Sequence, residues 1–253
     1  MNRDYWENLA ATYDEQIFSV WRNDEAGRIR DVIAEHARPD ASAADLGCGP
    51  GQVTPHLAHH FQHVYASDVS SRLLAQARQA CRGLENVSFH RCDLSTGEPA
   101  PFSPVDFVVC INVLLTPDLE KRERLWTGVT SLVADGGTLL LVLPSHESAL
   151  YTNYRRVDWY LRAGCNGDEA LRHGLPTSGD VRRLEHGVRS LEGVATKHYL
   201  REEIIVQLAD RGLTTERIER LTYSWSTEFE EPPEWLAEPF PWNWLVVAKR
   251  PAY

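Results

Sequence analysis

A glycine-rich turn follows the first apolar run of the chain at residues 42–46, and helix-compatible sequence follows the turn at residues 52–60. The glycines stand at alternate positions, Gly47, Gly49 and Gly51. Because glycine has no Cβ and tolerates positive φ, a ligand can approach the backbone closely at such a turn. The pattern predicts a strand, a tight turn and a helix. A strand-to-helix connection that binds no ligand could have the same sequence.

Apolar runs and helical patterns then alternate along most of the chain. The run at residues 105–112 is almost wholly apolar, as expected of a parallel strand buried on both faces. Alternation of this kind predicts an α/β fold with a doubly wound, mainly parallel sheet. The further strands are expected at 63–67, 87–90, 138–143, 217–226 and 244–249. The helical segments are expected within 4–37 and at 73–81, 119–133, 150–161 and 202–211.

Polar residues stand at the ends of the first four predicted strands, namely Gly47, Asp68, Asp93 and Asn112. Ligands of such sheets bind outside the carboxyl ends of the strands, so these positions converge on one crevice. Asp68 could accept hydrogen bonds from both hydroxyls of a ribose, or it could cap the following helix. Asp93 could contact a ligand or form an Asx turn.

The segment Asp45-Leu46-Gly47-Cys48-Gly49-Pro50-Gly51 resembles the first motif of the class I S-adenosylmethionine-dependent methyltransferases. A dinucleotide fingerprint would space its glycines as Gly-x-Gly-x-x-Gly. Cys92-Asp93-Leu94, the fourth-strand end at residues 111–115 and the turn before the fifth strand at 132–141 are similar to later segments of the same family. The resemblance covers about residues 40–145 well.

This resemblance implies one Rossmann-like domain over residues 1–253, with a seven-stranded sheet whose last strand is antiparallel. N-terminal helices would occupy residues 1–38, and a lid or substrate-binding insertion would occupy residues 145–200. Asp68 would bind the ribose and Asp93 the adenine amino group. A tyrosine of the N-terminal helices would close over the cofactor, although Tyr13 could equally be a core residue. The implied residues for S-adenosylmethionine, or the product S-adenosylhomocysteine, are Tyr5, Tyr13, Asp45, Gly47, Cys48, Gly49, Gly51, Asp68, Val69, Cys92, Asp93, Leu94, Ile111 and Asn112.

The expected methyl acceptor is a small molecule, methylated on nitrogen, oxygen or carbon, and secondary metabolism is a candidate setting for the reaction. The net charge of −10 and the lack of a basic stripe oppose a nucleic-acid partner. The fourth-strand end also lacks the Asn-Pro-Pro-Tyr and Pro-Cys sequences of enzymes that methylate DNA bases. Two other functions stay open, an NAD-linked oxidoreductase and a catalytically silent binding protein of the methyltransferase fold. No metal site is expected.

Two histidines are candidates for a general base, which an amine, hydroxyl or carbon acid would need. His146 follows the fifth strand, and His198 precedes the predicted helix at 202–211. A base of near-neutral pKa would make turnover rise near pH 6–7. Either residue could instead be a surface or capping histidine.

Aromatic residues of the insertion and of the last thirty residues could line the pocket for the acceptor. The alternative for the C-terminal group is a core or dimer surface, and Trp244 is expected within the last strand. The acceptor candidates are Tyr151, Tyr154, Trp159, Tyr199, Trp225 and Trp242.

Length and cysteine content favour a single intracellular domain. The chain has 253 residues, enough for one large α/β domain. Its five cysteines show no Cys-x-x-Cys spacing and are expected to be reduced thiols. The N-terminus lacks the apolar core of a signal peptide, and no run is long enough to span a bilayer. We expect a cytoplasmic protein without a membrane partner, either a monomer or a homodimer.

Overall fold

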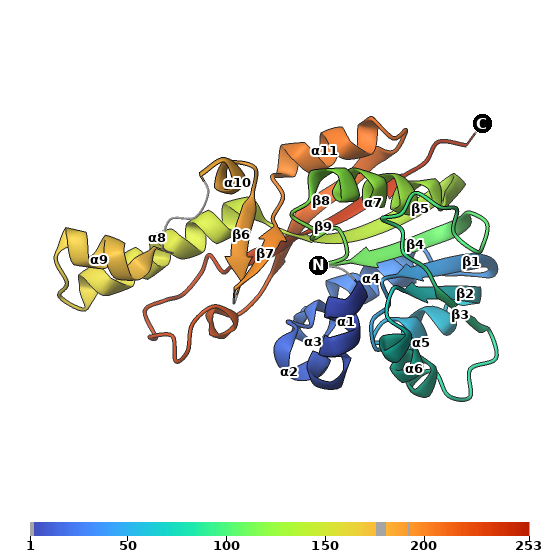
Figure 1. Cartoon of the computed structure of the whole chain (residues 1–253), viewed down its shortest axis with the longest axis horizontal. Helices are drawn as coiled ribbons and strands as arrows, with labels where there is room; N and C mark the ends of the chain where they lie inside the picture. Colours follow the sequence, from blue (N-terminus) through green and yellow to red (C-terminus); the bar gives the residue numbers. More distant parts are fainter. Residues whose placement is uncertain (1–2, 176–180, 192, 253) are drawn as a thin grey trace.

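A seven-stranded sheet forms the centre of the computed structural model, which describes residues 3–175, 181–191 and 193–252 (Figure 1). The strand order is β3-β2-β1-β4-β5-β9-β8. Neighbouring strands from β3 to β5 are parallel, whereas β9 runs antiparallel to both β5 and β8. The strands are β1 (Arg38–Leu46), β2 (Phe61–Asp68), β3 (Val87–Arg91), β4 (Val105–Ile111), β5 (Val133–Pro144), β8 (Thr214–Thr222) and β9 (Trp242–Lys249). The predicted α/β fold, with seven strands and an antiparallel last strand, is therefore confirmed.

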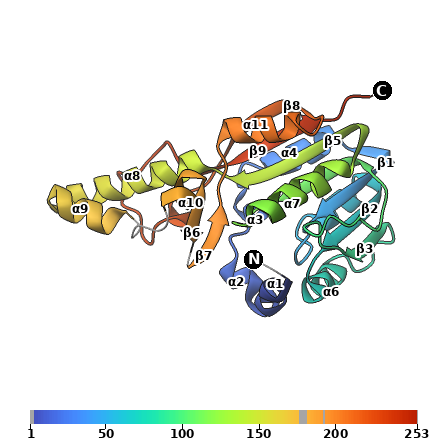
Figure 2. The same cartoon turned by 45° about the horizontal axis from the view of Figure 1, so that its top comes forward.

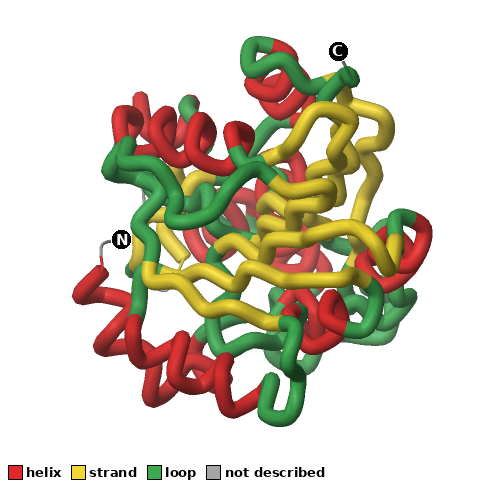
Figure 3. Tube along the Cα trace, turned by 90° about the vertical axis from the view of Figure 1, so that its right-hand side faces the viewer, coloured by secondary structure: helices red, strands yellow, loops and turns green. Residues whose placement is uncertain are grey.

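Both faces of the sheet are covered, as the continuous apolar runs predict. In β4, Val108 and Cys110 pack into one hydrophobic core, while Phe107 and Val109 pack into the other. This division follows from the two-residue repeat of a strand, which sends successive side chains to opposite faces. Figure 3 shows the twisted strands with helices on both sides.

Two layers of helices cover the faces. Ile29 of α4 and Leu57 of α5 belong to the core that contains Phe107, whereas Trp126 of α7 and Leu208 of α11 belong to the other. The helix α6 packs its Leu74 beside the glycine-rich turn. These helices are α4 (Arg28–Glu35), α5 (Thr54–Ala58), α6 (Ser71–Ala80), α7 (Leu119–Ser131) and α11 (Arg201–Ala209).

The N-terminal segment is broken into short pieces rather than two regular helices. The pieces are α1 (Arg3–Leu9), the 3-10 turn η1 (Ala10–Thr12), α2 (Tyr13–Gln16) and α3 (Val20–Asn23). Glu7 attaches this segment to the sheet domain, because its carboxylate accepts hydrogen bonds from the backbone N–H groups of Ser71 and Arg72 at the start of α6. The N-terminal segment is thereby held beside the first two βα connections.

The insertion after β5 forms an arm and a hairpin. The helices α8 (His146–Arg162) and α9 (Gly167–Gly174) pack against each other and project away from the sheet (Figures 1 and 2). The helix α10 (Val181–Glu185) leads into a two-stranded antiparallel sheet of β6 (Val188–Leu191) and β7 (Val194–Lys197). The loop between β8 and β9 contains η2 (Trp225–Thr227) and packs along α8.

The structure differs from the sequence-based expectations at three places. The strand expected at 42–46 begins at Arg38, with an irregularity in its pairing before Ser42. The strand expected at 217–226 spans Thr214–Thr222 and gives way to η2. The hairpin of β6 and β7 was not predicted, because each of its strands has four residues, and a strand this short does not show a two-residue hydrophobic repeat. Within the described residues, no helix is long and apolar enough to cross a membrane.

Candidate functional site

A cavity of about 1100 Å³ opens at the carboxyl ends of the parallel strands. The residues just after β1, β2, β4 and β5 all line it, namely Gly47, Val69, Asn112 and Ser145. The N-terminal segment, the hairpin of β6 and β7 and one face of α8 complete the wall. Cavities that bind small molecules and cofactors have volumes of about 300–1,000 Å³. This one has room for a cofactor and a second small molecule together.

The glycine-rich turn serves two separate purposes. All of its glycines have positive φ, as the turn requires. Gly47 and Gly49 line the cavity, and a Cβ on Gly49 would lie 3.2 Å from the Tyr13 hydroxyl. Gly51 does not line it, and a Cβ there would lie 2.8 Å from the backbone Cα of Ala77 in α6. Gly51 therefore permits close packing of a helix, and its prediction as a cofactor residue is not supported by its position.

Two buried carboxylates stand behind the turn. Asp45 accepts a hydrogen bond of 2.6 Å from the Thr54 hydroxyl, and burial raises its pKa to about 6. Asp68 accepts hydrogen bonds from the backbone N–H of Gly49 at 3.0 Å and of Ser70 at 2.8 Å. Burial also raises the pKa of Asp68, although those two hydrogen bonds oppose the effect. Ser70, and not Asp68, caps α6.

The bonds of Asp68 leave it able to bind a ligand. An ionised carboxylate has about four lone-pair sites, and each oxygen of Asp68 uses one of them for the backbone. Asp68 is 8% exposed and lines the cavity, so its remaining sites are available there. A neighbouring pair of hydroxyls could occupy them.

The segment after β3 reaches the cavity with Cys92, Asp93 and Leu94. The Asp93 carboxylate accepts hydrogen bonds from the Ser95 backbone N–H at 2.9 Å and the Ser95 hydroxyl at 2.6 Å, both through Oδ1. The Asx turn that the sequence suggested is thus present. Because Oδ2 takes no part in it, Asp93 can still accept a hydrogen bond from a ligand.

Aromatic residues of the N-terminal segment cover this part of the cavity. Tyr5, Trp6 and Tyr13 line it, and the Tyr5 and Trp6 rings meet edge to face with centroids 5.0 Å apart. Burial, followed by the charge of Asp68, raises the pKa of Tyr13, so the phenol stays protonated and can donate. Trp6 was not among the sequence candidates, because its helical position alone does not show which way it faces.

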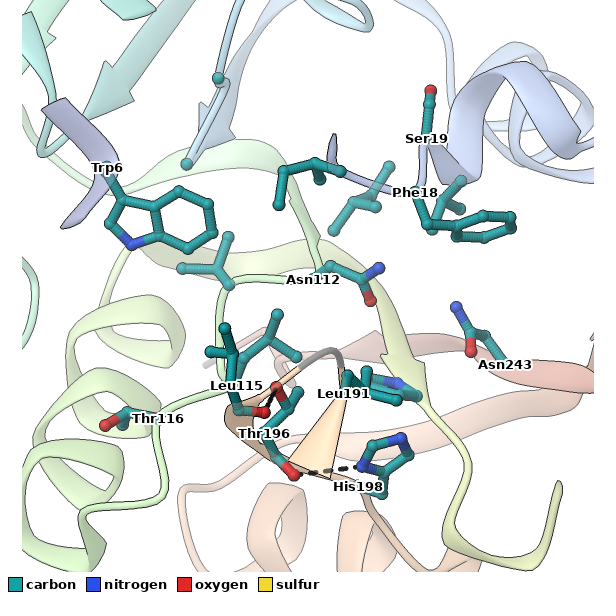
Figure 4. A pocket seen from close by; sticks show the side chains of 18 of the residues that line it. Trp6, Phe18, Ser19, Asn112, Leu115, Thr116, Leu191, Thr196, His198 and Asn243 are labelled. Atoms are coloured by element: carbon teal, nitrogen blue, oxygen red, sulfur yellow. Dashed lines mark hydrogen bonds between the residues drawn. The ribbon is translucent and has the colours of Figure 1, made fainter. Parts of the chain in front are cut away.

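Asn112 lies at the centre of the cavity, between Phe18 and Leu191 (Figure 4). It has a φ of +52°, which is uncommon for a residue with a side chain, and its buried Oδ1 has no hydrogen-bond partner in the described part of the chain. Strained backbone conformations and unsatisfied polar atoms gather at functional sites. Ile111 also lines the cavity, so each predicted cofactor residue except Gly51 is found there.

The other half of the cavity is built from segments after β5. One face of α8 contributes Ser148, Thr152 and Arg156, which are spaced four residues apart. The hairpin contributes Arg189 and Leu191. Phe18 of the N-terminal segment, together with Tyr223, Trp242 and Asn243, completes this part of the wall, and the Trp242 backbone N–H donates a hydrogen bond to the Ser148 hydroxyl. Apart from Trp242, no sequence argument identified these residues, since they come together only through the tertiary structure.

His198 lies in this second half with one ring nitrogen toward the Thr196 carbonyl oxygen, at 3.2 Å (Figure 4). A carbonyl can only accept, so Nδ1 carries the proton and Nε2 can accept one. Burial lowers the pKa of His198 to about 4. His198 is therefore neutral at pH 7, and the expectation of a titration near pH 6–7 is replaced by one near pH 4.

His146 does not line the main cavity. It lines a smaller one of about 310 Å³, together with Lys197 and Glu203, which form an ion pair of 2.7 Å. Burial lowers the pKa of His146, and its Nδ1 has no hydrogen-bond partner among residues 3–175, 181–191 and 193–252. Its prediction as a catalytic base has no support in this position.

The other predicted acceptor residues lie outside the main cavity. An α-helix turns by about 100° per residue, so Tyr151 points away from the α8 face that carries Thr152, whereas Trp159, seven residues on, lies on nearly the same face but about two turns farther along the helix. Those two pack with Trp225 and Phe229, whereas Tyr154 is 64% exposed. These positions give no support to their prediction as acceptor residues, which was based on the place of the insertion after the fifth strand.

Tyr199 and Trp225 are fully buried core residues. The Tyr199 hydroxyl donates a hydrogen bond to the Leu114 carbonyl oxygen, and its ring meets Trp126 edge to face. The Trp225 Nε1–H donates to the Ala237 carbonyl oxygen at 3.0 Å. Both polar groups are satisfied within the protein, so neither residue is placed to contact an acceptor.

No metal centre is visible in the part of the chain that the structure describes, where no three His, Cys, Asp or Glu side chains are grouped to hold an ion.

Comparison with known proteins finds a matching family model and several curated relatives. Residues 43–137 match the family model described as "Methyltransferase domain". Trans-aconitate 2-methyltransferase of Azoarcus sp. is 30% identical over 144 residues, which are 53% of this chain and 51% of that protein. The chain thus spans about half the length of the curated relatives it matches.

Solved structures of low sequence identity share the fold over almost the whole chain. The N-methyltransferase NodS of Bradyrhizobium japonicum, in complex with S-adenosylhomocysteine, has a TM-score of 0.61 at 16% identity and covers 98% of each chain. Magnesium protoporphyrin IX methyltransferase of Synechocystis with bound S-adenosylhomocysteine has a TM-score of 0.60 at 18% identity, covering 98% of this chain and 97% of its own. At these identities the likeness concerns the fold alone.

Proposed function

We propose that this chain, whose residues 43–137 match the family model described as "Methyltransferase domain", binds S-adenosylmethionine and transfers its methyl group to a small molecule. The observation that carries the proposal is the position of Gly49 against Asp68 and Tyr13 at the ends of β1 and β2. A backbone without side chain lies there beside a buried carboxylate, in a cavity of about 1100 Å³.

The proposed cofactor lies across the strand ends. Asp68 accepts hydrogen bonds from the ribose hydroxyls, and Asp93 accepts one from the adenine amino group. The methionine part lies over Gly47 and Gly49, near Asp45, where a carboxylate favours the ammonium and sulfonium charges. Asn112 offers its unsatisfied Oδ1 at the point where the two halves of the cavity meet. The family relatives of known substrate, such as the trans-aconitate enzyme, act on small molecules, which supports an acceptor of that size.

Methyl transfer from a sulfonium needs mainly position and the exclusion of water. The acceptor lone pair forms a bond to the methyl carbon while the carbon–sulfur bond breaks, and its electron pair stays on sulfur as the thioether of S-adenosylhomocysteine. Holding two reactants in line supplies a large part of the rate enhancement, with effective molarities of about 10⁵ M or more. His198 is the proposed base for an acceptor that must lose a proton, because its Nε2 is unprotonated at pH 7.

The described residues of the segment 145–200, which leave out 176–180 and 192, are proposed to close the acceptor side. Ser148, Thr152 and Arg156 of α8 and Leu191 of the hairpin supply its wall. The five cysteines are free thiols, which is consistent with the cytoplasmic location that we propose. A monomer or a homodimer remains our proposal for the assembly.

Binding experiments with purified protein test the proposal. Calorimetry should show S-adenosylmethionine and S-adenosylhomocysteine binding at micromolar level and no comparable binding of NAD. Mass spectrometry of the untreated protein should identify any adenosyl compound that copurifies. Binding of NAD without binding of either adenosyl compound would assign the cavity to an oxidoreductase. Cofactor binding without methyl transfer to any acceptor in a broad panel would favour the silent binding protein.

A further inference from the structure

The two halves of the cavity differ in charge. Three carboxylates, Asp45, Asp68 and Asp93, line the end formed by the strands, whereas Arg156 and Arg189 line the end formed by α8 and β6. The chain as a whole carries a net charge of −10, so two guanidinium groups on one wall of an internal cavity run against its overall balance. A local concentration of positive charge in a cavity attracts anions.

Arg189 is half-buried, and its guanidinium makes no hydrogen bond or ion pair with any of the described residues. Burial and then the neighbouring Arg156 lower the pKa of Arg189, which records the cost of placing it there. An unpaired charge removed from water costs free energy unless a partner compensates it. Within residues 3–175, 181–191 and 193–252, no acidic side chain supplies that partner.

Arg156 is only partly compensated. Its guanidinium carbon lies 5.2 Å from the centroid of the Phe229 ring, and the carboxylate of Glu228, which lines the same cavity, is close enough to interact with it electrostatically. Arg156 forms no ion pair in the described parts of the chain. The positive charge of Arg156 and Arg189 on this wall is therefore only partly neutralised by the described residues around them.

We propose that the methyl acceptor is an organic anion whose carboxylate or phosphate group binds Arg189, with Arg156 contributing to the same pocket. Arginine suits this task because its planar donors match both oxyanions in a bidentate arrangement. Leu191, Phe18 and Trp242 line the same half of the cavity and provide contacts for an apolar body. This inference rests on the proposed function, since it names the class of acceptor for the same site.

Pairs of acids and their uncharged amides test the inference without knowledge of the natural acceptor. Phenylacetate and phenylacetamide form one pair, and indole-3-acetate and indole-3-acetamide form another. Their affinities are measured by ligand-observed NMR on the full chain saturated with S-adenosylhomocysteine. We expect each acid to bind at least about tenfold more tightly than its amide. A ratio near one in every pair would overturn the proposal.

Substitution of Arg189 shows whether this residue causes the preference for acids over amides. In R189A the acids should lose roughly 10-fold to 100-fold in affinity, the scale of a hydrogen bond between charged groups. The affinities of the amides and of S-adenosylhomocysteine should not change, and R189K should lie between wild type and R189A. R172A removes the same charge from α9, outside the cavity, and should bind acids as wild type does. Equal acid affinity in R189A and R172A would refute the assignment.

Phenyl phosphate distinguishes the two oxyanions. If it binds more tightly than phenylacetate, with the same dependence on Arg189, the acceptor class is a phosphate ester; weaker binding assigns a carboxylate. The acid-against-amide comparison is repeated without S-adenosylhomocysteine. If that compound does not bind but the acid preference persists, the proposed function fails while the anion site stands.

Discussion

The two halves of the cavity are built by different kinds of segments of the same chain. The half at the strand ends consists of the short turns after β1, β2, β3 and β4, which lie within residues 43–137, and of Tyr5, Trp6 and Tyr13, which cover them from the N-terminal segment. The other half joins α8, a four-residue hairpin strand and the loop before β9, which are far apart in sequence. The first half is negative and the second positive. In our proposal, the part of the chain that matches the family model binds the cofactor, while the segments outside it bind the acceptor.

The largest effect that separates the halves should come from Gly49→Val. A branched side chain at a φ of +54° would occupy the space between the turn and Tyr13. We expect no detectable binding of S-adenosylhomocysteine by calorimetry, while acids still bind the acceptor half. Gly83→Val is the matched control, because Gly83 also has positive φ but has open space around it. Normal cofactor affinity in Gly49→Val would remove the turn from the site.

His198→Ala should act on the second half alone. If the acceptor must lose a proton, turnover should fall by about 10²–10⁴ with cofactor affinity unchanged. His146→Ala is the control outside the main cavity and should keep turnover within a few-fold of wild type. Full activity in the His198 variant would leave positioning and desolvation as the whole mechanism.

The pH profile sharpens the role of His198. A base must be unprotonated to act, and burial holds the pKa of His198 at about 4. Turnover of the wild type should therefore be level between pH 6 and pH 8 and decline only as the pH falls toward about 4. A rise in turnover between pH 6 and pH 7 that persists in His198→Ala would point to a different titrating group.

Asp68→Ala should weaken the cofactor half by a smaller amount, about 1.5–3 kcal/mol in binding S-adenosylhomocysteine, the scale of hydrogen bonds to a charged group. Because Asp68 also accepts from the backbone of Gly49 and Ser70, circular dichroism and thermal unfolding must show that the turn survives. Asp93→Ala is a useful comparison at the edge of the same half. Unchanged affinity in a folded Asp68→Ala protein would limit Asp68 to supporting the turn.

The smallest effect should be a pH dependence of cofactor affinity due to Asp45. Burial raises the pKa of this carboxyl to about 6, so it is ionised above that pH and neutral below it. The ionised form favours the positive charges of S-adenosylmethionine, so affinity should fall as the pH decreases through 6, by at most about tenfold per pH unit. Asp45→Asn should bind more weakly and show no such slope. An identical slope in that variant would assign the titration to another group.

The difference between the halves also explains what could be predicted from the sequence. Glycines and carboxylates at strand ends follow from local pattern and from the rule that ligands bind at the carboxyl ends of a parallel sheet, so Gly49, Asp68 and Asn112 could be selected. Gly51 shares the pattern but packs against α6, which no spacing reveals.

The acceptor half depends on tertiary packing. In the sequence, Trp225 and Tyr199 cannot be distinguished from Trp242 as candidates for the acceptor pocket. In the structure, Trp225 and Tyr199 are buried in the core, and their polar groups form hydrogen bonds within the protein. Arg189 sits in a strand of four residues, too short for a periodic signal. Its position beside Arg156 arises only when α8 and the hairpin come together.

A crystal structure with S-adenosylhomocysteine tests the central claim most directly. The account predicts the ribose at Asp68, the adenine beside Asp93 and Leu94, and the homocysteine part over Gly49, with the sulfur directed toward Asn112 and the acceptor half. The wall formed by Arg156 and Arg189 should remain free of the cofactor. Density for the ligand in the acceptor half, or strand ends left unoccupied at a saturating concentration, would contradict the account.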